Sequence, residues 1–142
     1  MRITPATPVR AGQVVADVMI RFPKMYGEGT TVEQAREYLL DDHVHALLFV
    51  DDGLLVAVVE GADLAGAPAA EPVWRFGRLA DRMVGAGEDL ATVTREMIRC
   101  GRRRLAVVDE DGRVAGLLCR KRSGRGFCSD ESVAARAAER GV

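Results

Sequence analysis

The sequence predicts an α/β (α+β) fold made of two similar units, each a helix, a β-hairpin and a second helix. Two observations lead to this prediction. An amphipathic helical pattern is followed, twice along the chain, by two short apolar runs with an acidic-glycine turn between them. In addition, residues 16–19 (ADVM) resemble residues 80–83 (ADRM), which indicates an internal repeat.

In the first unit, the helical pattern covers residues 31–42. Thr30 is expected to cap this helix, since Glu33 three positions later completes a capping box. The hairpin that follows pairs residues 47–51 with residues 55–59 across an Asp-Asp-Gly turn. Apolar residues at helical spacing predict a buried helix face of Val32, Ala35, Leu39 and Leu40.

The second unit repeats this order. Its helix is predicted over residues 90–100, with Asp89 as the cap and Gly101 as the stop signal. Its hairpin pairs residues 105–109 with residues 114–119. The expected buried helix face is Leu90, Val93, Met97 and Ile98. The side chains expected to be buried where the halves meet are Leu47, Phe49, Val107 and Leu117.

Residues 65–72 are mostly small and include two prolines, so they are predicted to link the two units. After a loop at residues 123–126, Ser129 is expected to cap a last helix. Asp130 and Glu131 follow it and suit the positive end of the helix dipole. The chain should therefore end in a helix.

Composition narrows the class of protein. Hydrophobic residues make up 48% of the 142 residues, charged residues 29%, and the net charge is −1. These values argue against a disordered chain and against a general nucleic-acid binder. The longest apolar runs, residues 46–50 and 54–59, are far shorter than the roughly 20 residues that cross a membrane. Without an N-terminal signal-peptide pattern either, we expect a cytoplasmic protein with no membrane association.

Three cysteines, Cys100, Cys119 and Cys128, form no C-x-x-C pair. An odd number without that spacing argues against a disulfide framework and against structural zinc. Cys128 lies in a Gly- and Arg-rich loop whose positive charge would favour a thiolate, so a redox role is the alternative to a simple reduced thiol. No Ser-His-Asp or Cys-His spacing and no phosphate-binding glycine loop is recognisable, so no enzyme is predicted.

The doubled order of elements resembles a tandem pair of CBS domains, a Bateman module. The resemblance implies two modules, at residues 11–66 and 73–142, packed about a pseudo-twofold axis. It also implies clefts for an adenosine-type ligand (AMP, ATP or S-adenosylmethionine), a homodimer, and regulation of a separate partner protein. The alternative is a ligand-independent dimerisation or scaffold module with degenerate clefts. The residues that support the resemblance are 15–19, 23, 30–35, 47–51, 53–64, 79–83, 90–101 and 105–118.

Family members often carry a Gly-hydrophobic-x-Thr/Ser-x-x-Asp signature, whose Asp binds ribose and whose hydroxyl binds phosphate. Here Asp63 matches the ribose residue, but Glu60 replaces the hydroxyl and would repel phosphate. The second half instead offers Arg120, Lys121 and Arg122, which are good phosphate partners. The interpretations are one composite nucleotide site, or a degenerate module whose charges are solvated.

Two further features are candidate sites. His43 and His45 are two residues apart near the start of a strand, so they could share one strand face and bind a metal. No third metal ligand accompanies them, which favours a structural or cleft-lining role. The resemblance places this segment near the adenine, so His45 is expected to contact the base. Residues 95–125 contain ten basic and four acidic residues, yet almost no aromatic residues for stacking. Nucleic acid is therefore the less favoured partner.

Overall fold

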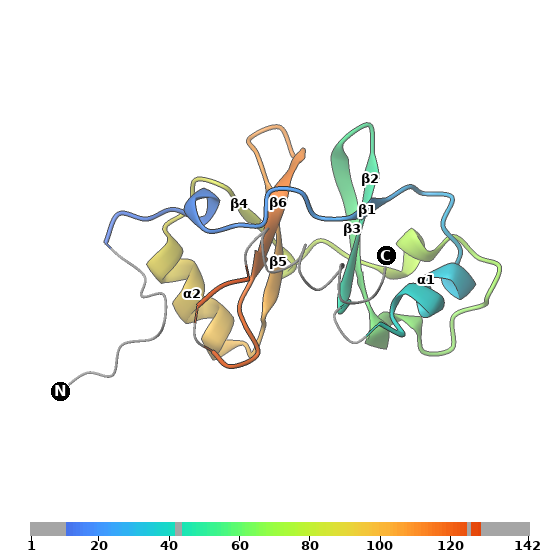
Figure 1. Cartoon of the computed structure of the whole chain (residues 1–142). Coiled ribbons are helices and arrows are strands. Elements are labelled where there is room, and N and C mark those ends of the chain that lie inside the picture. The colour runs from blue at the N-terminus through green and yellow to red at the C-terminus, as the bar shows by residue number, and fades with distance from the viewer. Residues whose placement is uncertain (1–10, 42–43, 125, 129–142) are drawn as a thin grey trace, which may run out of the picture.

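The computed structural model describes residues 11–41, 44–124 and 126–128. Within them, the chain forms two three-stranded sheets that face each other, each with an α-helix on its outer side (Figure 1). This arrangement confirms the predicted mixed fold of two similar halves. His43, the first ten residues and the predicted last helix, from Ser129 onward, lie outside the described residues.

Each sheet has an edge strand parallel to its middle strand, which then pairs antiparallel with the third. The first sheet has the order β1-β2-β3 and the second the order β4-β5-β6. The first half consists of β1 (Met25–Tyr26), α1 (Val32–Tyr38), β2 (Ala46–Asp51), β3 (Leu54–Glu60) and the 3-10 helices η2 (Gly61–Leu64) and η3 (Val73–Phe76). The second half consists of β4 (Met83–Gly85), α2 (Leu90–Arg99), β5 (Arg104–Val108) and β6 (Val114–Cys119), and the 3-10 helix η1 (Val15–Asp17) precedes both.

Capping chemistry sets where the helices begin. Thr31, not Thr30, caps α1: its hydroxyl accepts the Gln34 N–H (3.2 Å), and the Gln34 side chain accepts the Thr31 N–H (2.9 Å). The predicted capping box was therefore wrong by one residue, because the Thr30 N–H already closes a turn with the Gly27 carbonyl. In the second half the prediction is confirmed, since Asp89 accepts the Thr92 N–H (3.0 Å).

The buried helix faces are narrower than predicted. Helix α1 ends at Tyr38, so Leu40 lies beyond it and is 81% exposed. Ile98 is on the outer side of α2 and is 59% exposed. A helix that covers one sheet needs only one buried stripe. The other predicted residues are buried or partly buried: Val32, Ala35, Leu39, Leu90, Val93 and Met97.

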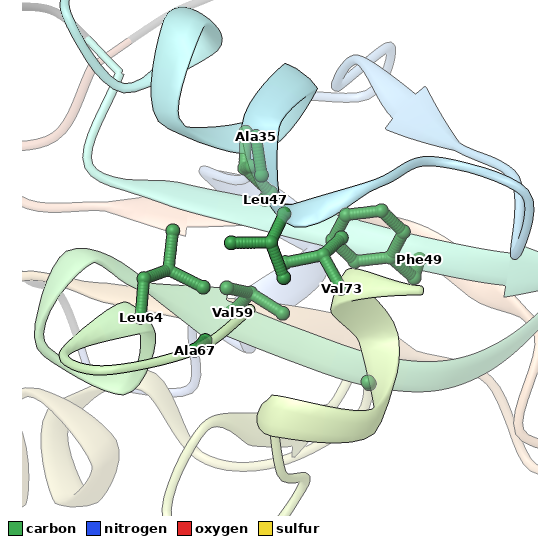
Figure 2. Close-up of a cluster of buried hydrophobic side chains, with 9 residues drawn as sticks. Ala35, Leu47, Phe49, Val59, Leu64, Ala67 and Val73 are labelled. Carbon is green, nitrogen blue, oxygen red and sulfur yellow. The ribbon is translucent and has the colours of Figure 1, made fainter. Parts of the chain in front are cut away.

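Each half has its own hydrophobic core between sheet and helix. Figure 2 shows the first core, where Val73 of η3 packs against Leu47 and Phe49 of β2. In the second core, Val15 of η1 packs with Leu90 and Val107. The 3-10 helices η1 and η3 thus cross over: η1, which precedes β1 in the chain, completes the second core, and η3, which precedes β4, completes the first.

The repeat has a different register from the one suggested by sequence. Met25 pairs with Leu48 in the first sheet, and Met83 pairs with Ala106 at the same place in the second. Met83 therefore corresponds to Met25, and not to Met19 as the similarity of residues 16–19 to residues 80–83 suggested. Residues 80–83 thus resemble residues 16–19 in sequence but do not occupy the equivalent place in the fold.

A third cluster joins the two sheets. Leu48, Leu55 and Val58 of the first sheet pack with Ala106 of the second, and Leu117 is partly buried against them. Of the four side chains predicted at this interface, only Leu117 is there. Leu47, Phe49 and Val107 are fully buried, but in the two outer cores. Neighbouring strand residues point to opposite faces, so an error of one residue exchanges the two sides.

Candidate functional site

An ion-pair network joins the two halves where β3 ends. Arg82 immediately precedes β4, and only 3% of its surface is exposed. Its guanidinium donates two hydrogen bonds to Asp63 (2.6 and 3.0 Å) and one to the Val58 carbonyl (2.8 Å). A Glu60 carboxylate oxygen lies 3.3 Å from the same guanidinium. Since a buried cation requires such partners, the first role of Asp63 is to neutralise Arg82.

The Asp63 carboxylate has little remaining capacity for a ligand. It also accepts the backbone N–H of Glu60 (2.7 Å). Burial raises the pKa of Asp63, but the hydrogen bonds from Arg82 and from the Glu60 N–H lower it more, so the net pKa lies below its ordinary value. A carboxylate offers about four lone pairs, and three are used here. Asp63 can thus accept one further donor, not both ribose hydroxyls.

Glu60 is also neutralised. Its second oxygen accepts a hydrogen bond from Arg102 (2.7 Å). Arg102 is held in place by the end of α2, because its backbone N–H donates to the Met97 carbonyl (2.8 Å) just after the left-handed Gly101. With guanidinium groups on two sides, Glu60 repels a nearby phosphate less than the sequence alone implied.

A cleft of about 260 Å³ opens beside this network, between the starts of β2 and β5. Its volume is close to the low end of small-molecule sites, about 300 Å³. Three arginine residues line it against one glutamate, so the charge around the cleft favours an anionic group. The lining residues are His45, Ala46, Glu60, Cys100, Gly101, Arg102, Arg103 and Arg104.

Two arginines at this cleft have unused donors. The Nε atoms of Arg103 and Arg120 are buried and, within the described ranges, have no hydrogen-bond partner. Arg120 lies against the cleft residues, since its guanidinium donates to the Arg102 carbonyl (3.3 Å) and its backbone N–H to the Arg103 carbonyl (2.8 Å). Leaving a buried donor unsatisfied costs about 1–3 kcal/mol, which an anionic oxygen at this position would recover.

The predicted site residues are only partly brought together. His45 and Glu60 line the cleft, and Arg120 borders it. Asp63 is paired with Arg82, and Lys121 and Arg122 are exposed in the turn after β6. No sequence pattern pointed to Arg82, and Arg102–Arg104 stood out only as part of a basic stretch. The sequence did contain a signal for Arg102–Arg104 as site residues, because they lie between the helix stop Gly101 and a buried strand.

A second, larger cavity of about 710 Å³ runs along β4 and α2. The first half has aromatic rings in the equivalent place: the ring centroids of Tyr26 and Tyr38 lie 4.8 Å apart, and those of Tyr26 and Phe49 lie 5.7 Å apart, with the rings tilted against each other. In the strand register the two strand positions correspond to Val84 and Val107. Smaller side chains therefore leave this groove open, and none of the predicted site residues lines it.

The described part of the chain shows neither a metal site nor a membrane-spanning helix. No group of three or more His, Cys, Asp or Glu side chains is placed to hold a metal ion there. Nor is any helix in these ranges long and apolar enough to cross a membrane.

Comparisons with known proteins identify relatives of this architecture. The sequence model of the CBS domain family matches residues 15–70. The crystal structure of CBSX2 in complex with AMP is 25% identical, with a TM-score of 0.66, and covers 92% of this chain and 100% of that one. The crystal structure of the cytosolic domain of the Mg²⁺ channel MgtE in complex with ATP is 27% identical, with a TM-score of 0.60. The match covers 72% of this chain but only 44% of that one. The CBS domain protein PAE2072 from Pyrobaculum aerophilum, complexed with AMP, is 18% identical, with a TM-score of 0.63 and coverage of 79% and 95%. No curated protein sequence matches.

Proposed function

Because this chain is a CBS-domain pair, we propose that it is a non-catalytic regulatory module that binds an adenosine-type ligand and modulates a separate partner protein. The observation that supports the proposal most is the group of arginine residues at the cleft of about 260 Å³. Arg103 and Arg120 each have a buried donor without a partner among the described residues. Two relatives of at least 25% identity, CBSX2 and MgtE, were solved with AMP and ATP.

The proposed orientation follows from the charges. The phosphate lies toward Arg103 and Arg120, whose buried Nε atoms have no hydrogen-bond partner within the described ranges. The base lies toward His45 at the start of β2. Asp63 accepts at most one ribose hydroxyl, because Arg82 and the Glu60 N–H occupy its other lone pairs. The ligand should therefore be held mainly through its phosphate.

One observation favours the second candidate function, a ligand-independent scaffold. The network of Asp63, Arg82, Glu60 and Arg102 already neutralises itself and ties β3 of one half to residues of the other. Such a network holds the halves together without any ligand. The two candidates differ in their response to nucleotide, which the following experiment measures.

The experiment is a thermal-shift titration of the full chain with adenosine, AMP, ATP and S-adenosylmethionine. A ligand that binds only the folded state raises the melting temperature in proportion to RT ln(1 + [L]/Kd). We expect ATP and AMP to raise it more than adenosine does. Arg103→Gln and Arg120→Gln should each weaken nucleotide binding by about 10-fold or more, the value of a hydrogen bond to a charged group.

Arg95→Gln is the matched control, since it removes the same charge from an exposed position of α2 outside both cavities. It should leave the shift unchanged. If no ligand at millimolar concentration shifts the wild-type protein, the sensor proposal fails and the scaffold is favoured. A shift that Arg103→Gln and Arg120→Gln leave intact would place the site elsewhere.

A further inference from the structure

Cys119 and Cys128 face each other directly across two paired segments. Cys119 is the last residue of β6, and the chain returns so that Phe127 forms a β-bridge with Arg120. The Cys128 N–H donates to the Cys119 carbonyl (2.7 Å). Their Sγ atoms are 2.9 Å apart, and the two residues are only 4% and 7% exposed.

This geometry differs from that of two unrelated buried thiols. A disulfide has a sulfur–sulfur bond of about 2.05 Å, so the two atoms need approach by less than about 1 Å. The backbone hydrogen bond already holds the two residues opposite each other. The third cysteine, Cys100, is exposed and lies in α2's terminal turn, away from this pair.

We propose that Cys119 and Cys128 are a reversible oxidation site, at which a peroxide converts the two thiols into an intramolecular disulfide. One thiolate attacks the peroxide oxygen; the O–O bond breaks, a sulfenic acid forms and one water leaves. The second thiol then attacks that sulfur, the S–S bond forms, and a second water leaves. Two electrons pass from the thiols to the peroxide, and a dithiol reductant reverses the step.

The product would close the segment between the two cysteines into a covalent ring. That segment contains Arg120, Lys121 and Arg122, so oxidation would fix part of the cationic border of the cleft. The contact with Cys128 and burial raise the pKa of Cys119, while Arg104 and Arg103 oppose this rise. Because the thiolate is the reactive form, oxidation should be slower than that of an exposed cysteine.

Tryptic mapping of the full chain tests this inference. Trypsin cuts at Arg113, Arg120, Lys121, Arg122 and Arg125, so Cys119 falls in fragment 114–120, Cys128 in fragment 126–136, and Cys100 in fragment 100–102. The protein is treated with hydrogen peroxide, blocked with N-ethylmaleimide, digested and measured by mass spectrometry with and without dithiothreitol. The expected product is fragment 114–120 linked to fragment 126–136, lighter by two hydrogen atoms and separated by dithiothreitol.

The controls use the third cysteine. Cys100→Ser should keep the linked fragments, whereas Cys119→Ser and Cys128→Ser should lose them. The decisive measurement is made on the wild-type chain, so it does not depend on how these variants fold. Alkylation or higher oxidation of Cys119 and Cys128 without any link, or links only through Cys100 between chains, would overturn the proposal. No nucleotide is used, so the result is independent of the proposed ligand.

Discussion

The buried Arg82 makes a sharp test of how the two halves are held together. In Asp63→Ala the guanidinium, with its side chain 4% exposed, loses its bidentate partner and keeps only the Val58 carbonyl and Glu60 at 3.3 Å. Removing one partner of a buried ion pair costs about 3–5 kcal/mol. We expect the lower end, about 3 kcal/mol, because Glu60 remains and the Asp63 side chain is itself 13% exposed.

Urea unfolding followed by far-ultraviolet circular dichroism measures this loss. With a slope of about 2 kcal/mol per molar urea, the midpoint should fall by about 1.5 M. The double variant Asp63→Ala, Arg82→Met should recover much of the loss, because replacing both charges by apolar groups is often close to neutral. Glu96→Ala is the control: it breaks the exposed pair with Arg99 and should leave the midpoint unchanged. If Asp63→Ala shifted the midpoint as little as Glu96→Ala does, the buried network would contribute no stability.

Three further predictions concern acid stability, the core and assembly. The pKa of Asp63 is lowered in the folded protein. Its contribution to the free energy of unfolding is therefore present above the unfolded-state pKa of about 4 and is lost as the pH falls through the folded-state pKa. Asp63→Ala should flatten the acid side of a stability–pH curve measured by urea unfolding. Val107, 0% exposed, should not tolerate Asp, whereas Ile98→Asp at a 59% exposed position should still give soluble folded protein by circular dichroism. We propose a homodimer, so sedimentation at tens of micromolar should give twice 15.4 kDa, and a monomer mass would count against it.

Local patterns predicted the elements well because local chemistry determines them. Asp89 and Gly101 bound α2 as expected, since a side-chain cap and a left-handed stop act within one turn. The inward face of each strand was harder. Leu47 and Leu48 are both apolar and both buried, so a continuous apolar run does not say which one faces the other half.

The site was less predictable because its main contacts connect distant parts of the chain. His45 and Glu60 could be found at strand ends, where the family resemblance places clefts. Arg82 could not, since its partner Asp63 is reached only when the two halves pack together. The similarity of residues 16–19 to residues 80–83 also aligned Arg82 with Val18, which concealed its correspondence to Lys24.

The correspondence of Lys24 to Arg82 shows how the charged residues of the two halves differ. Lys24, the equivalent of Arg82, lies over the rings of Tyr26 and Tyr38 (5.7 and 5.8 Å). The strand register likewise places Cys119 where the first half has Glu60. The first half thus supplies the acids that neutralise Arg82 and Arg102. The second half supplies Arg103 and Arg120, whose Nε atoms, like that of Arg82, are buried and unmatched in the described chain. Divergence of two similar halves has separated the residues that hold the module together from those available to an anionic ligand.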